Sequence, residues 1–354
     1  MINQIIDGTK LKSIFDNWLN EENHEKLDPL TEVETISKSL SLKFAKSFSS
    51  EELNSIRMLA EGGINWLIFK GVCQGIDKIN IDTPTDFPPI QHSNLWWPVA
   101  QVTIGLLSAC KFRPISYKSE NDGALFQNLV AGNSQKSKGR LRGHTDAVAF
   151  PFQLREVSGH KISSSPNFVV LSGIRNPNRV PTWLAPAQKI YSKIDKVRPG
   201  ASNKLFEKCF DIEPQPSFDT NKLPPNYKLI DECLREFDQL GHPLMRFKNS
   251  GIDISSSIDK HEKDIYVEVL REITRALEDD LNRQEKEIFE EVIVEPGDIL
   301  IVNNRCALHG RGKVTNSNDS KDIGGLSRWL LRTYGYKLDT HGIADPDLSH
   351  CMLP

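Results

Sequence analysis

Two histidines and an aspartate are the residues of this chain whose types and spacing best suit metal chemistry. His144 and Asp146 stand one residue apart inside a β-type run, and in an extended strand side chains at i and i+2 point to one face. His309 follows the apolar run 299–302, which itself follows a turn at 295–298. Two imidazoles and one carboxylate from different strands form the facial triad that holds Fe(II) and leaves coordination positions open for a co-substrate and oxygen.

Each of these signals has a plainer explanation when it is taken alone. Nine histidines and 47 acids in 354 residues yield about one His-x-Asp or His-x-Glu triplet by chance. His309 alone is more typical of an interior or loop histidine. The same three side chains also suit zinc or another divalent ion that hydrolyses a substrate with a metal-bound water. A non-catalytic jelly-roll binding module, with the histidines in its core, is a third interpretation.

Two arginines in the run 327–334 point to acidic ligands. If the run is a strand, Arg328 and Arg332 share one face and lie roughly 13 Å apart, at about 3.3 Å per residue, which is too far for both to bind one small carboxylate. A buried guanidinium keeps its charge and therefore needs an anion. Two separate ligands, such as a keto acid and an amino acid, would supply the anions. Alternatively, the arginines point to solvent or pair with Asp298 or Asp322.

Three runs in a fixed order, HTD, PGDILIVNNRCALHGRG and SRWLLRTYGY, resemble the clavaminate-synthase-like group of Fe(II)/2-oxoglutarate-dependent dioxygenases. This group includes hydroxylases of free arginine, asparagine and lysine, and the resemblance spans roughly residues 120–338. The distal motif of the group is typically PGDLLIxDNxxxxHGR followed by DRWLxR. This chain departs from it at Asn303 and Ser327, where the group has aspartate, and in the longer polar loop 313–325.

The resemblance implies a role for seven residues. The iron ligands would be His144, Asp146 and His309. Arg328 would bind the distal carboxylate of 2-oxoglutarate, with Thr182 as a further co-substrate contact. Arg332 would bind the α-carboxylate of the substrate, and Gln127 would help to hold its amino group.

The reaction implied by the resemblance is the hydroxylation of an unactivated carbon of a free L-amino acid. Fe(II), 2-oxoglutarate and O2 would take part, with release of succinate and CO2. Asp146 replaces the glutamate of many of these hydroxylases, as in the subset that resembles lysine hydroxylases, so we expect L-lysine to be hydroxylated at C3 or C4. Arginine, asparagine and ornithine are alternatives. The carboxylate of Asp146 also argues against halogenation. Candidate acids that could bind the side-chain ammonium group of lysine are Asp231, Glu232 and Asp253.

The elements that must position these residues predict a mainly β protein with flanking helices. From about residue 112, short β-type runs separated by Gly, Pro and Asn are typical of an antiparallel sandwich or barrel. The resemblance makes this an α+β chain with a double-stranded β-helix core, which is a jelly roll of the cupin-like kind. Helical spacing predicts helices before residue 70, a core helix over 95–110 and an amphipathic helix around 265–281.

We expect residues 1–354 to form a single dioxygenase domain. A helical N-terminal layer would cover 1–110, the jelly-roll core 111–338 and a C-terminal tail 339–354. The segment at about 186–258 is too long for a plain connection and has weak periodicity, so we interpret it as an insertion that acts as a lid.

Composition narrows the choice of partners and compartment. A net charge of -3 gives no basic stripe for a nucleic acid, and the most apolar run, 95–110, is too short to span a membrane. The first residues lack the pattern of a signal peptide, so we expect a cytoplasmic protein. Six cysteines without a Cys-x-x-Cys pair suggest no zinc ribbon, iron–sulfur cluster or disulfide framework. The expected partner is a small amino-acid substrate, and the sequence leaves the oligomeric state open.

Overall fold

Two antiparallel-rich sheets form the centre of the molecule. The computed structural model describes residues 4–21, 23–76, 83–84, 94–130, 139–157, 159–314, 328–337 and 352–353. The larger sheet has eight strands, with the order β1-β2-β16-β8-β18-β3-β19 and β4 paired to β18. The smaller sheet has four strands, in the order β15-β9-β17-β5. This is the expected jelly-roll core with flanking helices.

The strands of the larger sheet are β1 (Ile5–Asp7), β2 (Trp66–Lys70), β3 (Phe112–Tyr117), β4 (Gln127–Val130), β8 (Phe168–Arg175), β16 (Ile299–Asn303), β18 (Trp329–Lys337) and β19 (Met352–Leu353). Those of the smaller sheet are β5 (Leu141–His144), β9 (Thr182–Pro186), β15 (Glu290–Val292) and β17 (Ala307–Arg311). A separate hairpin is formed by β6 (Arg155–Val157) and β7 (His160–Ile162).

The apolar run of β16 is continuous because both faces of the larger sheet are covered. Leu300 and Val302 belong to the core between the two sheets, whereas Ile299 and Ile301 pack on the N-terminal helices. Side chains alternate between the two faces of a strand, so a strand that is buried on both sides needs apolar residues at every position. The turn before β16 requires Gly297, whose φ is +84° and whose place leaves no room for a Cβ.

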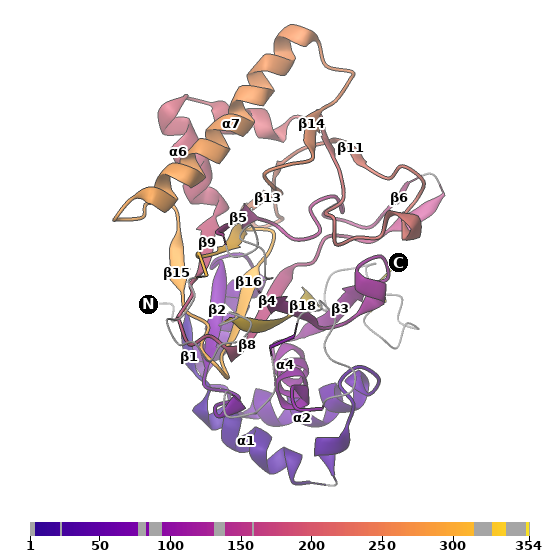
Figure 1. Ribbon diagram of the computed structural model, residues 1–354, viewed down its shortest axis with the longest axis vertical. Helices are drawn as coiled ribbons and strands as arrows, with labels where there is room; N and C mark the ends of the chain where they lie inside the picture. The colour runs from indigo at the N-terminus through magenta and orange to yellow at the C-terminus, as the bar shows by residue number, and fades with distance from the viewer. Residues whose placement is uncertain are drawn as a thin grey trace.

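The N-terminal helices lie on the outer face of the larger sheet, at the bottom of Figure 1. They are α1 (Thr9–Leu19), α2 (Val33–Ser47), α3 (Ser50–Ala60) and α4 (Trp97–Ala109). Ser49 and Glu52 form a capping box at the start of α3, and α4 is the core helix expected over 95–110. The region is not purely helical, however, because β1 and β2 join the sheet. The sequence prediction missed β2, since periodicity cannot separate a short buried strand from a buried helix.

The segment 186–258 contains its own small elements. They are α6 (Ala187–Val197), β10 (Phe210–Ile212), β11 (Leu229–Glu232), β12 (Arg235–Phe237), β13 (Pro243–Met245) and β14 (Ile252–Ile254). The strands form a sheet in the order β11-β10-β14 and a hairpin β12-β13. Phe210, Leu229 and Met245 are completely buried. They belong to the same core cluster as the side chains that fill the space between the two main sheets. The segment therefore packs continuously on the jelly roll.

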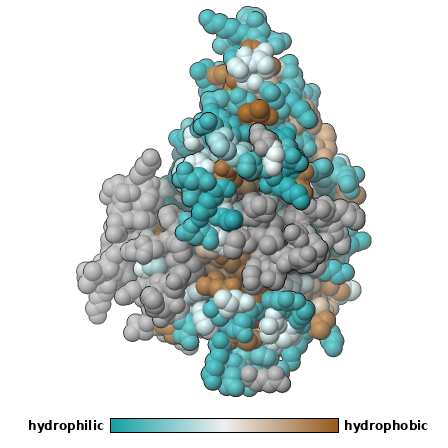
Figure 2. Space-filling model, turned by 90° about the vertical axis from the view of Figure 1, so that its right-hand side faces the viewer, coloured by the Kyte–Doolittle hydropathy of each residue, from teal (hydrophilic) through white to brown (hydrophobic). Residues whose placement is uncertain are grey.

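The amphipathic helix expected around 265–281 is α7 (Lys260–Asn282), at the top of Figure 1 beside α6. Its buried stripe contains Val269, Ile273, Leu277 and Leu281, as expected, but Ile265 is 41% exposed. In Figure 2, the described surface of this upper part is mostly hydrophilic, with hydrophobic residues in small patches. Among the described helices, none is both long enough and apolar enough for a membrane span.

Several expectations fall on residues outside the described part of the chain. These are Asp322, Ser327, the loop 313–325 from residue 315 onward, Cys351 and all of the tail 339–354 except β19. The five cysteines that the structure describes are buried and form no disulfide with one another. Short 3-10 helices occur at His24–Lys26, Asn121–Gly123, Ala201–Phe206 and Thr220–Lys222.

Candidate metal centre and anion site

Two neighbouring strands of the smaller sheet bring the two histidines together. β17 pairs with β5, and His309 lies directly opposite His144 in the register. The sequence prediction that Asp146 lies in the same strand as His144 is wrong. β5 ends at His144, and Asp146 lies in the following turn. That turn includes Ala147 at a φ of 52°. The turn rather than strand alternation directs the carboxylate toward both imidazoles.

The three side chains converge on one point. Asp146 Oδ1 lies 3.4 Å from His144 Nε2 and 3.6 Å from His309 Nε2. One ligand atom from each residue lies within 4.8 Å of the others. His144 Nδ1 lies 2.9 Å from the carbonyl oxygen of Arg142, so Nδ1–H donates and the Nε2 lone pair is available. These spacings suit one ion with bonds of about 2.0 to 2.2 Å, and the residues fit a facial triad.

The electrostatic environment keeps the carboxylate ionised. Burial opposes a charge on Asp146, but the interactions with Arg332, His309 and His144 together outweigh it and hold the pKa of that carboxyl well below its usual range. Burial lowers the pKa of His309. Burial has the same tendency at His144, but the hydrogen bond and charge of Asp146, together with the hydrogen bond to the Arg142 carbonyl, outweigh it and raise the pKa of that imidazole. An ionised carboxylate beside the imidazole of His309, whose neutral form is favoured, is a donor set that suits a divalent cation.

Asn304 holds the turn that carries Asp146. Its Oδ1 accepts the Asp146 backbone N–H at 2.8 Å, and its Nδ2 donates to Asp146 O at 3.0 Å and to Pro166 O at 3.2 Å. The side chain is 1% exposed, and three hydrogen bonds fix its orientation. Sequence reasoning noted Asn304 only as part of a motif, because a side-chain contact with backbone groups 158 residues away leaves no local pattern.

Arg328 is a buried cation without an acidic partner among the described residues. It lies directly before β18, is 4% exposed, and donates from Nη2 to Thr182 Oγ1 at 2.8 Å. Burial and the neighbouring charge of Arg311 lower the pKa of this guanidinium to about 9. Because arginine keeps its charge in proteins, such a site calls for an anion. The predicted pair of Arg328 and Thr182 is therefore brought together.

This anion site lies next to β17, the strand that carries His309. Arg311 is two residues after His309 in β17, and its register partner in β9 is Thr182. Side chains two residues apart in a strand share a face and are separated by roughly 7 Å. An elongated dianion with one end at the triad and the other at Arg328 fits this arrangement.

Arg332 has several acidic and polar partners. Its Nη1 contacts Asp146 Oδ2 at 3.1 Å, and its Nη2 contacts Glu120 Oε1 at 2.8 Å and donates to Gln127 Oε1. Burial opposes the charge, but Glu120, Tyr334 and Asp146 together outweigh it and raise the pKa of the guanidinium. The predicted Arg332 and Gln127 thus meet beside the triad. Sequence reasoning missed Glu120, since a single acid after a strand carries no signal.

The alternatives weighed for the arginines are wrong wherever the structure describes them. Both guanidinium groups are buried, and Asp298 instead pairs with Lys70 at 2.6 Å. Among the acids considered for an ammonium tail, Glu232 pairs with Arg155 at 3.2 Å and Asp231 accepts from Ser255 at 2.7 Å. Both acids therefore have partners of their own within the protein.

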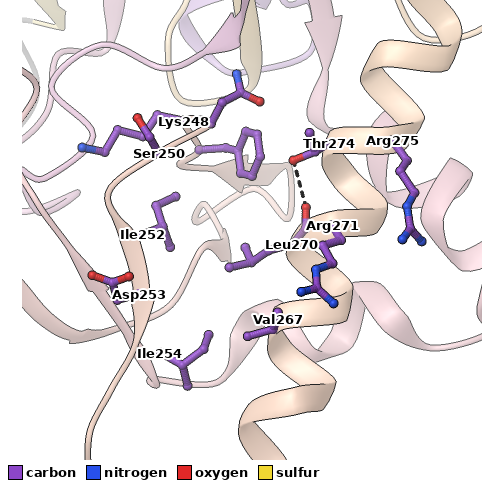
Figure 3. Close-up of a pocket in the computed structure, with 12 residues that line it drawn as sticks. Lys248, Ser250, Ile252, Asp253, Ile254, Val267, Leu270, Arg271, Thr274 and Arg275 are labelled. Atoms are coloured by element: carbon purple, nitrogen blue, oxygen red, sulfur yellow. Dashed lines mark hydrogen bonds between the residues drawn. The ribbon is translucent and has the colours of Figure 1, made fainter.

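A groove of about 380 Å³ lies between α7 and the segment 247–254. Figure 3 shows its apolar floor, which includes Ile252 and Leu270, and the polar side chains at its edge, which include Asp253. The segment also contacts the turn that carries Asp146, because Phe247 O accepts from Thr145 N at 2.9 Å. Residues of one segment thus line the groove and support the triad.

No model of a known protein family and no curated protein sequence matches the chain. Solved structures do match. A structure of asparagine oxygenase in complex with Fe(II), 2S,3S-3-hydroxyasparagine and succinate aligns with a TM-score of 0.67 and 17% identity, over 95% of this chain and 94% of that chain. The non-heme iron oxygenase OrfP in complex with Fe, succinate and (3S)-hydroxy-L-Arg aligns with a TM-score of 0.67 and 15% identity, over 95% of each chain.

OrfP in complex with Fe and alpha-ketoglutaric acid, which is 2-oxoglutarate, aligns with a TM-score of 0.65 and 16% identity over 95% of this chain and 94% of that chain. At these identities the similarity concerns the fold. This chain has the fold of these non-heme iron oxygenases.

Proposed function

We propose that this chain is an Fe(II)/2-oxoglutarate-dependent dioxygenase that hydroxylates an unactivated carbon of a free L-amino acid. The observation that carries the proposal is a buried arginine, Arg328, that has no acidic partner among the described residues and is hydrogen-bonded to Thr182 on the sheet that carries the two histidines of the His-Asp-His cluster. A cluster alone suits several divalent ions. The added anion site favours chemistry that uses a metal together with a dianionic co-substrate.

Bound Fe(II) supplies the oxidation of a C–H bond by O2, coupled to the conversion of 2-oxoglutarate into succinate and CO2. His144, Asp146 and His309 hold the ion, with Oδ1 of Asp146 facing both imidazoles. Its other oxygen, Oδ2, is engaged by Arg332. Arg328 and Thr182 bind the distal carboxylate of 2-oxoglutarate, which gives the buried guanidinium its anion.

Arg332 binds the α-carboxylate of the amino-acid substrate in this proposal. Lysine, hydroxylated at C3 or C4, is the substrate to test first, because Asp146 stands where many hydroxylases of the resembled group have glutamate. Asparagine and arginine come next, because hydroxylated forms of these amino acids occupy the similar structures, and ornithine completes the panel.

The segment 186–258 covers the substrate and shields it from water. Support comes from its contacts with the metal-binding turn, where Gln215 Nε2 donates to Thr145 O at 3.1 Å and Phe247 N donates to Thr145 Oγ1 at 3.2 Å. A bound substrate would add contacts and slow the proteolysis of this segment. Equal proteolysis rates with and without substrate and 2-oxoglutarate would refute the covering role.

The test is anaerobic reconstitution with Fe(II) and 2-oxoglutarate, followed by oxygen exposure and quantification of succinate across the amino-acid panel. We expect an absorption band from the metal and keto acid in the reconstituted protein. Succinate should then rise with one amino acid and disappear in Asp146→Ala. Asp122→Asn is the matched control, because its side chain is 92% exposed.

The absence of both the band and succinate formation would refute the dioxygenase proposal. Hydrolysis by a divalent ion at the same triad would need neither a keto acid nor Arg328. Metal-dependent hydrolysis that persists without 2-oxoglutarate and in Arg328→Met would therefore identify the hydrolase instead.

A further inference from the structure

Glu120 is a buried carboxylate, and one of its oxygens lacks a hydrogen-bond partner in the part of the chain that the structure describes. The residue follows β3 and is 1% exposed. Its Oε1 lies 2.8 Å from Arg332 Nη2 and 3.5 Å from the hydroxyl of Tyr334, which donates to it. Among the described residues, Oε2 has no partner. A buried acceptor of this kind is costly unless a ligand or water supplies a donor.

A second buried acceptor lies on the adjoining segment. Gln215 uses its Nε2 to donate to Thr145 O, while its Oε1 has no partner among the described residues. The segment runs beside Glu120, because Phe218 forms a β-bridge with it. Two acceptors without donors thus belong to adjoining segments next to the metal-binding turn. Their chemistry suits a ligand that brings N–H donors.

The charges around Arg332 favour a ligand that carries both a negative and a positive charge. Its guanidinium has five N–H donors, and the contacts with Asp146, Glu120 and Gln127 use three of them. The remaining donors, which include Nε–H, can receive a carboxylate. A ligand with only a carboxylate would add a third acid around one cation. An α-amino acid also brings an ammonium group, which offsets the charge of Glu120.

Gln127 is a weaker acceptor for that ammonium group than Glu120, because its amide oxygen is neutral. Its Oε1 already accepts a hydrogen bond from Arg332. The rest of its side-chain amide is an Nε2 group that can only donate. Glu120 therefore offers what Gln127 lacks, which is a charged oxygen that is still available.

We propose that Glu120 binds the α-ammonium group of the substrate while Arg332 binds the α-carboxylate, so that the site selects the zwitterion of a free α-amino acid. This inference rests on the proposed function and assigns the specificity of its substrate site. It adds Glu120 as a substrate-binding residue, and it limits Gln127 to the orientation of Arg332.

The test compares Glu120→Gln with the wild-type protein and with Asp122→Asn as the exposed control. Calorimetry of protein loaded with Fe(II) and 2-oxoglutarate, without oxygen, measures the binding of L-lysine, L-arginine and L-asparagine and of their analogues without the α-amino group, 6-aminohexanoate, 5-guanidinopentanoate and succinamate. For the amino acid that wild type binds best, Glu120→Gln should weaken binding by about 10- to 100-fold. Binding of the matching analogue should change less than about 3-fold, so the preference for the amino acid collapses.

Glu120→Asp separates charge from folding. It retains the carboxylate, so we expect the preference for the amino acid to survive with a smaller loss of affinity. An unchanged preference in Glu120→Gln would refute the role of Glu120, and so would equal losses for both ligands in both variants. Failure of wild type to bind 2-oxoglutarate, or any of the three amino acids, would instead refute the proposed function on which this role rests.

Discussion

The two buried arginines of the site differ in their partners. Arg332 contacts two carboxylates, those of Asp146 and Glu120, whereas Arg328, among the described residues, donates to a hydroxyl, that of Thr182. The pKa of Arg332 is accordingly raised, while that of Arg328 is lowered to about 9 by burial and Arg311. One arginine is thus stabilised by the protein itself, and the other depends on a ligand for its anion.

Within one site, this difference separates an arginine that is paired with acids before any ligand binds from one that is not. Removing a partner from a buried ion pair leaves an uncompensated charge, whereas removing a buried charge that lacks a partner relieves a cost. The same kind of substitution should therefore have opposite effects on stability at the two positions.

Arg332→Met should have the largest effect. It leaves the carboxylates of Asp146 and Glu120 buried without their shared cation, so we expect a loss of about 3 to 5 kcal/mol in the free energy of unfolding of the metal-free protein. Urea denaturation at neutral pH measures this loss. A loss below about 1 kcal/mol would show that the contacts of Arg332 contribute little to stability. The contrast drawn between Arg332 and Arg328 would then be wrong.

Arg328→Met should act in the opposite direction. An apolar side chain of similar length removes a buried charge that lacks an acid, so the ligand-free protein should become more stable by about 1 to 4 kcal/mol. The same variant should lose affinity for 2-oxoglutarate, as measured by the anaerobic absorption band. A less stable ligand-free variant would contradict the view that Arg328 awaits a ligand.

Asn304→Ala should have an intermediate effect. It removes the side-chain bonds to Asp146 and Pro166 and leaves buried backbone groups unsatisfied, at a cost of about 1 to 3 kcal/mol. Loss of orientation of Asp146 should also weaken metal binding by about 10- to 100-fold. Competition with a chelator measures this affinity. Unchanged metal affinity would show that the turn keeps its shape without Asn304.

Arg142→Gln should have the smallest effect and serves as the contrast to both buried arginines. Arg142 pairs with Glu278 at 2.6 Å, but the two side chains are 55% and 42% exposed. Exposed pairs contribute less than about 1 kcal/mol, and salt screens them. Urea denaturation at low and high salt should show a small difference. A loss as large as that of Arg332→Met would mean that the exposure of an arginine does not determine how much its ion pairs contribute to the free energy of unfolding.

Much of the fold follows from patterns within single segments. The run at 299–302 predicted β16, and the spacing of Val269, Ile273 and Leu277 predicted one face of α7. The exposed fraction of Ile265, 41%, shows the limit of such patterns, because the end of a stripe depends on what packs against it. β2 lies beyond that limit too, since its neighbours in the sheet are β1 and β16.

The residues of the candidate site likewise fall into those that the sequence predicted and those that it did not. His144, Asp146 and His309 were found because their residue types limit the chemistry that they can perform, although the turn at Asp146 was not predicted. Glu120 and Asn304 were missed because their roles arise from contacts with residues far along the chain. Tertiary contacts of this kind leave no periodicity or short motif in a single sequence.

The position of β5 has a consequence for local unfolding. It is the last strand of the smaller sheet in the described part of the chain, and its pairing with β17 is interrupted by a register shift after His309. An ion held by His144 and His309 would therefore join these two strands as a cross-link. Backbone amides of Leu141–His144 should exchange with deuterium quickly in the metal-free protein and slowly once the ion is bound. In this view the metal also completes the folding of the strand that carries its own ligand.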